Sequence, residues 1–140
     1  MGNTFKLDIV ASDHVFYSGE CDELVFPGLD GSFGILANHE PMITCLNSGE
    51  MKYRVGDKWY YASVSEGFVE IMPKFVTILA DTVERPEEID IKRAEAAKQR
   101  AEERLRQKQS IKQYYHTQAA LNRAMARLKL SSKHGKNINL

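Results

Sequence analysis

Residues 51–62, MKYRVGDKWYYA, contain two five-residue runs on either side of Gly56-Asp57. In the first run apolar and charged side chains alternate, which is typical of a half-buried β-strand. Gly-Asp suits a two-residue turn with positive φ, the geometry that joins adjacent antiparallel strands. The segment therefore predicts a β-hairpin.

The same period of two recurs from residue 4 to about residue 81. Short strands separated by turn signals every 8–12 residues or so are typical of antiparallel sandwiches and barrels. We therefore expect an antiparallel β-sandwich or barrel over residues 1–85. Besides the hairpin, its expected strands are Phe5–Ile9, Val15–Tyr17, Cys21–Phe26, Gly67–Ile71 and Phe75–Leu79.

The glycine-rich segment Gly28–Gly34 follows one of these strands. It has neither the GxGxxG pattern nor the Gly-Lys-Ser/Thr of phosphate-binding loops, and no helix signal follows it. We therefore expect turns there, in which glycine supplies positive φ. The alternative is that the next residues, Ile35–Pro41, form an ordered loop that presents apolar groups to a partner.

The composition changes at Pro86, where proline and the acids after it are typical of the first turn of a helix. Two apolar stripes interrupted at Ser110 predict an antiparallel two-helix hairpin over residues 86–140, so the fold class is β + α. Both stripes are rich in alanine and bury little apolar area, so the hairpin should open more easily than the sandwich. They comprise Ile91, Ala94, Ala97, Ala101 and Leu105, then Ala120, Leu121, Ala124, Met125 and Leu128, with fraying through Ser131, Ser132 and Gly135.

A neutral total of 19 basic and 19 acidic residues hides a division of charge. Residues 1–84 carry five Lys/Arg against 13 Asp/Glu, a net of −8, and residues 85–140 carry a net of +8. The neutral total argues against a dedicated nucleic-acid binder. No apolar run approaches the ~20 residues of a membrane span, and the N-terminus lacks a signal-peptide pattern, so we expect a cytosolic chain.

The residues predict no catalytic and no metal site. No GxSxG or HExxH motif occurs, and the four histidines are scattered. Cys21 and Cys45 have no metal-ligand spacing and are expected to be free, buried thiols.

Four arginines of the C-terminal half suggest an anion site. Arg93 and Arg100 are seven residues apart and share one helix face, and Arg123 and Arg127 are four apart on the second helix. In an antiparallel hairpin the four would converge, and guanidinium groups bind phosphate bidentately. An ordinary solvated helix face is the alternative, and the residues by themselves favour it. Asp90 can likewise be a simple helix N-cap.

Four segments occur in order along the chain: Gly31–Met42 (GSFGILANHEPM), Gly67–Glu70 (GFVE), Val76–Asp81 (VTILAD) and Ile89–Ala94 (IDIKRA). In this order and spacing they resemble the epsilon subunit of bacterial F-type ATP synthases. The resemblance extends from Phe5 to the end of the second predicted helix.

The resemblance implies a non-catalytic rotor-stalk subunit, peripheral at the cytoplasmic face of the cell membrane and without lipid insertion. Its sandwich would bind the gamma subunit and rest on the membrane ring of c subunits. The family usually has Pro-Gly or a similar turn before the histidine of the ring-facing loop, whereas this chain has Ala37-Asn38. The interface residues implied there are Phe33, Ile35, Leu36, His39 and Pro41.

In bacterial members of this family the hairpin regulates the enzyme. Folded, it permits turnover; extended, it reaches the alpha and beta subunits and blocks ATP hydrolysis. Some members bind ATP in the folded hairpin through Ile/Leu-Asp-x-x-Arg-Ala, which this sequence matches. The resemblance thus implies ATP as a regulatory ligand, with magnesium not strictly required. The implied ATP-binding residues are Glu84, Ile89, Asp90, Arg93, Ala94, Arg100, Arg123 and Arg127.

A free-standing binding module is the alternative. In that case the basic helices would dock on an acidic protein or on nucleic acid. A steep salt dependence of nucleic-acid affinity would support it.

Overall fold

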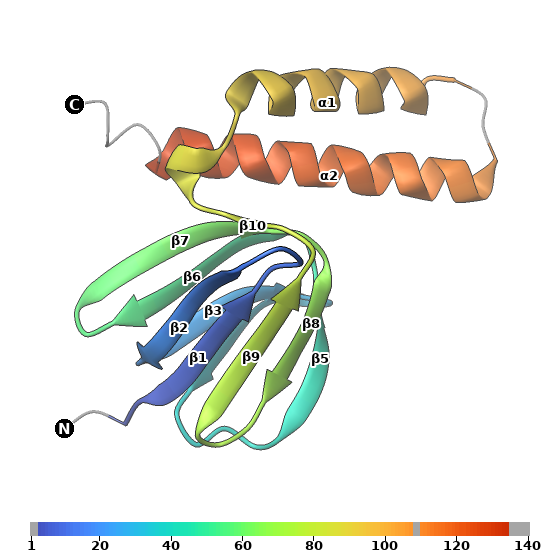
Figure 1. Ribbon diagram of the computed structural model, residues 1–140. Helices are drawn as coiled ribbons and strands as arrows, with labels where there is room; N and C mark the ends of the chain where they lie inside the picture. The colour runs from blue at the N-terminus through green and yellow to red at the C-terminus, as the bar shows by residue number, and fades with distance from the viewer. Residues whose placement is uncertain (1–2, 108–109, 135–140) are drawn as a thin grey trace. The chain divides into compact units, whose positions relative to one another are not determined.

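The computed structural model describes residues 3–107 and 110–134. The chain forms two compact units, Met1–Glu84 and Arg85–Leu140. The first unit contains the β-strands and the second the helices, which confirms the predicted β + α class (Figure 1).

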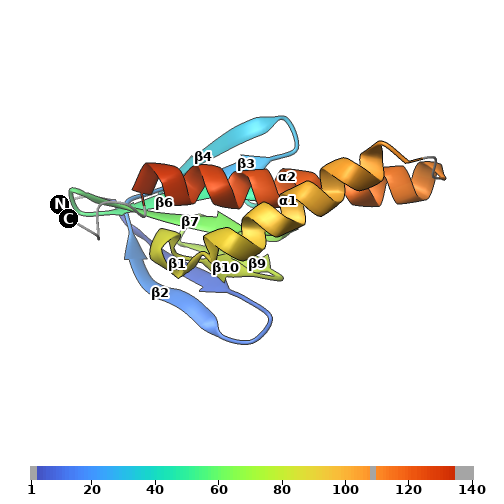
Figure 2. The same ribbon diagram turned by 90° about the horizontal axis from the view of Figure 1, so that it is seen from above.

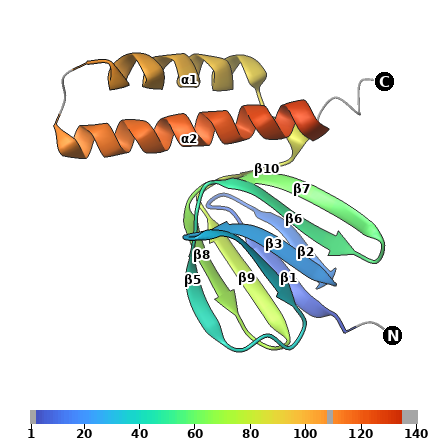
Figure 3. The ribbon, with the colours of Figure 1, turned by 180° about the vertical axis from the view of Figure 1, so that it is seen from behind.

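The first unit is a sandwich of two five-stranded sheets. Sheet A has the order β2-β1-β9-β8-β5, and sheet B has the order β10-β7-β6-β3-β4 (Figures 1 and 3). Neighbouring strands are antiparallel except β1 and β9, which pair in parallel. The strands are β1 Phe5–Val10, β2 Val15–Cys21, β3 Glu23–Gly28, β4 Gly31–Leu36, β5 Met42–Leu46, β6 Gly49–Val55, β7 Lys58–Val64, β8 Gly67–Ile71, β9 Phe75–Ala80 and β10 Val83–Glu84.

Alternate residues of the strands form one hydrophobic core. In β1, Phe5, Leu7 and Ile9 are buried, as their alternation with polar residues predicts. In β3, Leu24 and Phe26 are buried from the opposite sheet. The intervening side chains point to the outer faces, because successive residues of a strand face opposite sides.

The hairpin predicted at residues 51–62 is confirmed. Strands β6 and β7 pair in antiparallel register with Val55 opposite Lys58, and Gly56 has a φ of 63° in the turn. Met51 and Tyr53 point into the core, whereas Lys52 and Arg54 lie on the outer face of sheet B.

The prediction of turns at Gly28–Gly34 is wrong for most of the segment. Residues 31–36 form strand β4, which pairs with β3 over six residue pairs, and the turn is confined to Leu29 and Asp30. Gly31 has a φ of 112° and continues the chain out of the turn. Most of β4 is exposed, so its sequence lacks the apolar alternation that marks the other strands.

The second unit contains a short 3-10 helix, η1, Pro86–Glu88, and two long helices, α1 Ile91–Leu105 and α2 Ile111–His134. The helix expected from Pro86 therefore starts five residues later, because Pro86 opens the separate 3-10 turn. Helix α2 also continues through the fraying predicted at Ser131 and Ser132, since Leu130 and Ser131 are buried. The predicted fraying at Gly135 lies outside the described residues.

The two helices pack antiparallel, as predicted (Figures 1 and 2). Ala94 and Ala101 of α1 are buried, and Leu121 and Ala124 are buried on α2. Small side chains let the helix axes approach closely but leave little apolar area to bury. Two residues of the predicted stripes, Ile91 and Met125, are instead largely exposed.

The backbone of β9 passes close to Gly67 of β8. A Cβ at this position would overlap the carbonyl oxygen of Leu79 in the neighbouring strand. We expect Gly67→Ala to destabilise the sandwich by roughly 3 kcal/mol, because one strand must move to relieve the overlap. Urea unfolding followed by circular dichroism would measure the change in the free energy of unfolding.

Gly34→Ala is the matched control for this substitution. Gly34 also lies in a strand, but a Cβ there would meet no atom within 4 Å. Equal stability of the two variants would contradict the close approach at Gly67.

Candidate functional site

The start of α1 carries the sequence motif that suggested an ATP site. Asp90 is the N-cap of the helix, and its Oδ1 accepts a hydrogen bond of 3.1 Å from the backbone N–H of Arg93. The capping role considered for Asp90 is thereby confirmed. Capping fixes the carboxylate at the first turn of the helix.

Two other residues of the motif are buried rather than open to a ligand. Ile89 is buried between η1 and α1, and Ala94 is fully buried within the hairpin. They shape the packing at the start of the hairpin. Glu84 is half-buried on β10, in the sandwich unit and directly before the hairpin.

The arginines expected to converge lie on both helices of the hairpin. Arg93 and Arg100 are both exposed on α1 and lie about 10 Å apart along the helix axis, at a rise of 1.5 Å per residue. Arg123 and Arg127 are half-buried and one turn apart on α2. Because the helices are antiparallel, Arg93 lies toward the late part of α2 that carries these two residues. We call Arg93, Arg100, Arg123 and Arg127 the arginine strip.

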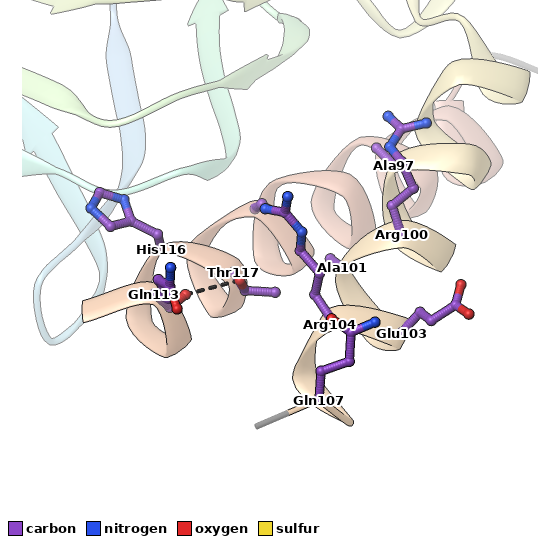
Figure 4. A pocket seen from close by; sticks show the side chains of 10 residues that line it. Ala97, Arg100, Ala101, Glu103, Arg104, Gln107, Gln113, His116 and Thr117 are labelled. Carbon is purple, nitrogen blue, oxygen red and sulfur yellow. Dashed lines mark hydrogen bonds between the residues drawn. The ribbon is translucent and has the colours of Figure 1, made fainter. Parts of the chain in front are cut away.

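Arg100 lines a groove of about 740 Å³ between the two helices. Figure 4 shows Arg104 on the same helix, one turn further along, and His116 and Gln113 on α2. The hydroxyl of Thr117 donates a 2.9 Å hydrogen bond to the backbone oxygen of Gln113 (Figure 4). The groove also contains the carboxylate of Glu103, so its two arginines leave it with a net positive charge, which suits an anionic ligand.

Sequence reasoning missed Arg104, His116 and Gln113 as members of this groove. The four-residue spacing of Arg100 and Arg104 indicates a shared helix face, but it does not identify the residues of α2 opposite them. That information depends on the register of the two helices.

The partner interface predicted around the β4 segment is mostly accessible. Leu36 is 59% exposed on β4, and Pro41 is exposed beyond it. The Phe33 ring stacks on the buried ring of Phe26 at 5.3 Å and lies 5.9 Å from the His39 ring. Ile35 is only 1% exposed and belongs to the core, so its side chain is not available to a partner.

Asn38 takes the backbone conformation that glycine usually supplies. Its φ is 67°, and its N–H donates a 2.8 Å hydrogen bond to the oxygen of Pro73. Asparagine tolerates this left-handed region better than most residues. The chain therefore makes the sharp turn before His39 without a glycine.

Sheet A carries an exposed apolar row that the sequence did not reveal. The row crosses four strands in register: Cys45 pairs with Phe68, Phe68 with Leu79, and Leu79 with Val10. Phe68 is 59% exposed and Leu79 is 50% exposed. A contiguous apolar strip on an outer face is typical of a protein-binding surface.

A polar row runs beside it on the same face. Glu70 pairs with Thr77, and Thr77 pairs with Asp8. The two carboxylates therefore lie on β8 and β1, the strands on either side of the central strand β9. The hydroxyl of Ser18 donates a 2.6 Å hydrogen bond to Asp8. The face thus combines an apolar strip with negative charge.

Within residues 3–107 and 110–134, no cluster of histidine, cysteine or acidic side chains could hold a metal ion. Neither of the helices described there has the length and hydrophobicity of a membrane span.

Comparisons with known proteins cover both units of the chain. The family described as "ATP synthase, Delta/Epsilon chain, beta-sandwich domain" matches residues 4–86, and its "long alpha-helix domain" matches residues 87–132. A mitochondrial ATP synthase structure from Euglena gracilis contains a chain of the same fold. The TM-score is 0.71 at 18% identity, over 99% of this chain and 83% of that one.

Curated relatives extend over nearly the full chain. The ATP synthase epsilon chain of Ruminiclostridium cellulolyticum is 48% identical, over 93% of this chain and 97% of the relative. The epsilon chain of Desulforamulus reducens is 43% identical, over 92% and 98%. Together with the family matches to both units, these identities show that the chain belongs to the family of ATP synthase epsilon chains.

Proposed function

We propose that the chain is a non-catalytic subunit of the central rotor stalk of a bacterial F-type ATP synthase. It couples the catalytic head to the ion-translocating membrane ring and lies peripherally at the cytoplasmic face of the membrane. Membership of the epsilon family supports this proposal. The main observation in favour of this proposal is the exposed apolar row of sheet A. A contiguous apolar surface of this kind is stabilised when a partner protein covers it permanently and removes it from water.

The two accessible regions of the sandwich are assigned to two partners. The apolar row, flanked by Asp8 and Glu70, binds the gamma subunit. Phe33, Leu36, His39 and Pro41 face the c-ring. These contacts are between proteins, and no part of the chain inserts into lipid.

Placing a charge in the apolar row should release the subunit from its complex. We expect Phe68→Glu to lower recovery of the alpha, beta and gamma subunits with the tagged chain from membranes by at least about tenfold, because a desolvated carboxylate has no partner there. Quantitative immunoblotting of the recovered subunits would measure the loss.

Lys58→Gln is the matched control, since it changes the net charge by the same amount at an exposed position of sheet B. Equal recovery with Phe68→Glu and wild type would contradict the assignment of the row. Steeply salt-dependent binding of nucleic acid by the chain, without recovery of the other subunits, would instead favour a free-standing module.

We further propose that the hairpin binds ATP and that the bound state is the folded one. Arg93, Arg123 and Arg127 contact phosphates at the start of the hairpin, and Arg100 does so from the groove. Asp90 and Glu84 face the ribose or the adenine, and Ile89 and Ala94 support the site from within the packing. The arginines already supply positive charge, so magnesium is not strictly required.

Binding of ATP opposes inhibition by holding the hairpin folded. Extended, the hairpin reaches the alpha and beta subunits and blocks ATP hydrolysis. A ligand at a concentration equal to its dissociation constant stabilises the folded state by only ~0.4 kcal/mol, and a hundredfold excess by ~2.7 kcal/mol. The switch is therefore decisive only where the ATP concentration greatly exceeds the dissociation constant.

Removing one arginine of the strip should weaken ATP binding. We expect Arg127→Ala to raise the dissociation constant by about tenfold or more, the cost of losing a charge-assisted hydrogen bond to phosphate. Isothermal calorimetry on the full chain would measure it, with Lys129→Ala as control for loss of a positive charge on the same helix.

Equal heats from wild type and Arg127→Ala would refute the site. Repeating the titration in the presence of a metal chelator tests whether ATP binding requires magnesium. Abolished affinity in the chelator would overturn the proposal that magnesium is dispensable.

ATP should also narrow the range of distances between the sandwich and α2. Cys45 is an exposed thiol, whereas burial raises the pKa of Cys21 to about 11, so a thiol reagent at neutral pH labels Cys45. A second label at Lys112→Cys or at Lys129→Cys reports on each end of α2. We expect saturating ATP to narrow both distance distributions.

The same labelled chains carrying Arg127→Ala should not respond to ATP. If the distances respond to ATP equally with and without this substitution, the response does not depend on the proposed site. If neither labelled chain responds, ATP does not close the hairpin. Either result would contradict the proposal that ATP holds the hairpin folded.

A further inference from the structure

Positive charge in the acidic sandwich unit is concentrated on one hairpin. Of the five lysines and arginines in residues 1–84, three belong to β6 and β7, namely Lys52, Arg54 and Lys58. The rotor contacts proposed above use other strands, so this concentration has no role in them.

Two of these cations stack on the same aromatic ring. The ammonium of Lys52 lies 4.6 Å from the centre of the Trp59 ring, and the guanidinium carbon of Arg54 lies 5.8 Å from it. Arg54 pairs with Trp59 across the strands, and Lys52 pairs with Tyr61. All four side chains lie on the outer face of sheet B, because residues next to them along the two strands, Met51, Tyr53 and Ala62, point into the core. We call Lys52, Arg54, Trp59 and Tyr61 the basic-aromatic face.

The guanidinium of Arg54 is held in place on three sides. Its Nη1 donates a 2.7 Å hydrogen bond to the oxygen of Gly56, and its Nη2 lies 3.6 Å from Oε1 of Glu23. Trp59 covers the third side. A cation that is already ordered loses little further side-chain entropy when it binds a carboxylate.

Apolar groups adjoin these cations on neighbouring strands. Val25 of β3 pairs with Lys52, and Glu23 of β3 pairs both with Arg54 and with Leu36 of β4. Leu36 is 59% exposed. The basic-aromatic face and its surroundings therefore alternate positive charge with apolar surface.

We infer that the basic-aromatic face binds an acidic, extended polypeptide segment of a partner protein. Carboxylates at alternate positions of the segment pair with Lys52 and Arg54, and Val25 adjoins this contact on β3. An extended chain matches the spacing, since alternate residues of a strand lie about 7 Å apart and point the same way. Charge complementarity directs the segment to this face of an otherwise acidic unit.

A long polyanion fits the same face poorly. Glu23 lies 3.6 Å from the Arg54 guanidinium, Asp22 accepts a hydrogen bond from the N–H of Gly56 in the adjoining turn, and the unit as a whole carries a net charge of −8. Nucleic acid or an anionic bilayer would extend beyond the cations and meet these carboxylates. In addition, Lys52 and Arg54 already lie over the Trp59 ring, so they compete with any nucleic-acid base that would stack on it.

Trp59 provides the readout, because it is the single tryptophan of the chain. We would titrate the full chain with a blocked octapeptide of alternating glutamate and leucine at low salt and follow tryptophan emission. We expect a saturable change, weakened at least about fivefold by Lys52→Glu, which leaves the bonds of Arg54 to Gly56 and Glu23 in place. Lys6→Glu makes the same change of charge on sheet A and should alter the dissociation constant less than about twofold.

Several outcomes would overturn the inference. Equal weakening by Lys6→Glu and Lys52→Glu would show that only the overall charge of the chain attracts the peptide. A matched peptide of glutamine and leucine that binds equally well would exclude a role for carboxylates. Tighter binding of single-stranded DNA or phosphatidylserine vesicles, lost in Lys52→Glu, would assign the face to a different class of partner.

Discussion

Burial of alternate residues in the sandwich core is the constraint on which both outer faces depend. Once Leu7, Phe26 and Met51 point inward, their neighbours along each strand must point outward. Strand register then aligns these outward residues into rows, the apolar row on sheet A and the basic-aromatic face on sheet B. Chemically different surfaces thus lie on opposite sides of one core.

The helical unit is held together by a smaller apolar contact than the sandwich. Its helices meet through Ala94, Ala101 and Ala124, which allow close contact but supply little hydrophobic free energy. This small apolar contact is the physical basis for the ligand-controlled hairpin that we propose.

Much of the architecture follows from local patterns. Residues 51–62 specify their hairpin through alternation and Gly56-Asp57, and the break at Ser110 separates the helices. Strand β4 could not be predicted, because its exposed glycines carry no apolar alternation and pairing with β3 stabilises it. Spacing placed Arg93 and Arg100 on one helix face. The apolar row and the α2 side of the groove depend on register between distant segments, which no local pattern contains.

The parallel pairing of β1 with β9 affects when the sandwich can form during synthesis. Lys6 pairs with Phe75, so sheet A stays incomplete until nearly the whole first unit has left the ribosome. Such non-local pairing slows folding, because a long loop must close before its contacts form. The helical unit is synthesised after the sandwich, so its basic residues leave the ribosome once every strand of the acidic unit is available to pair.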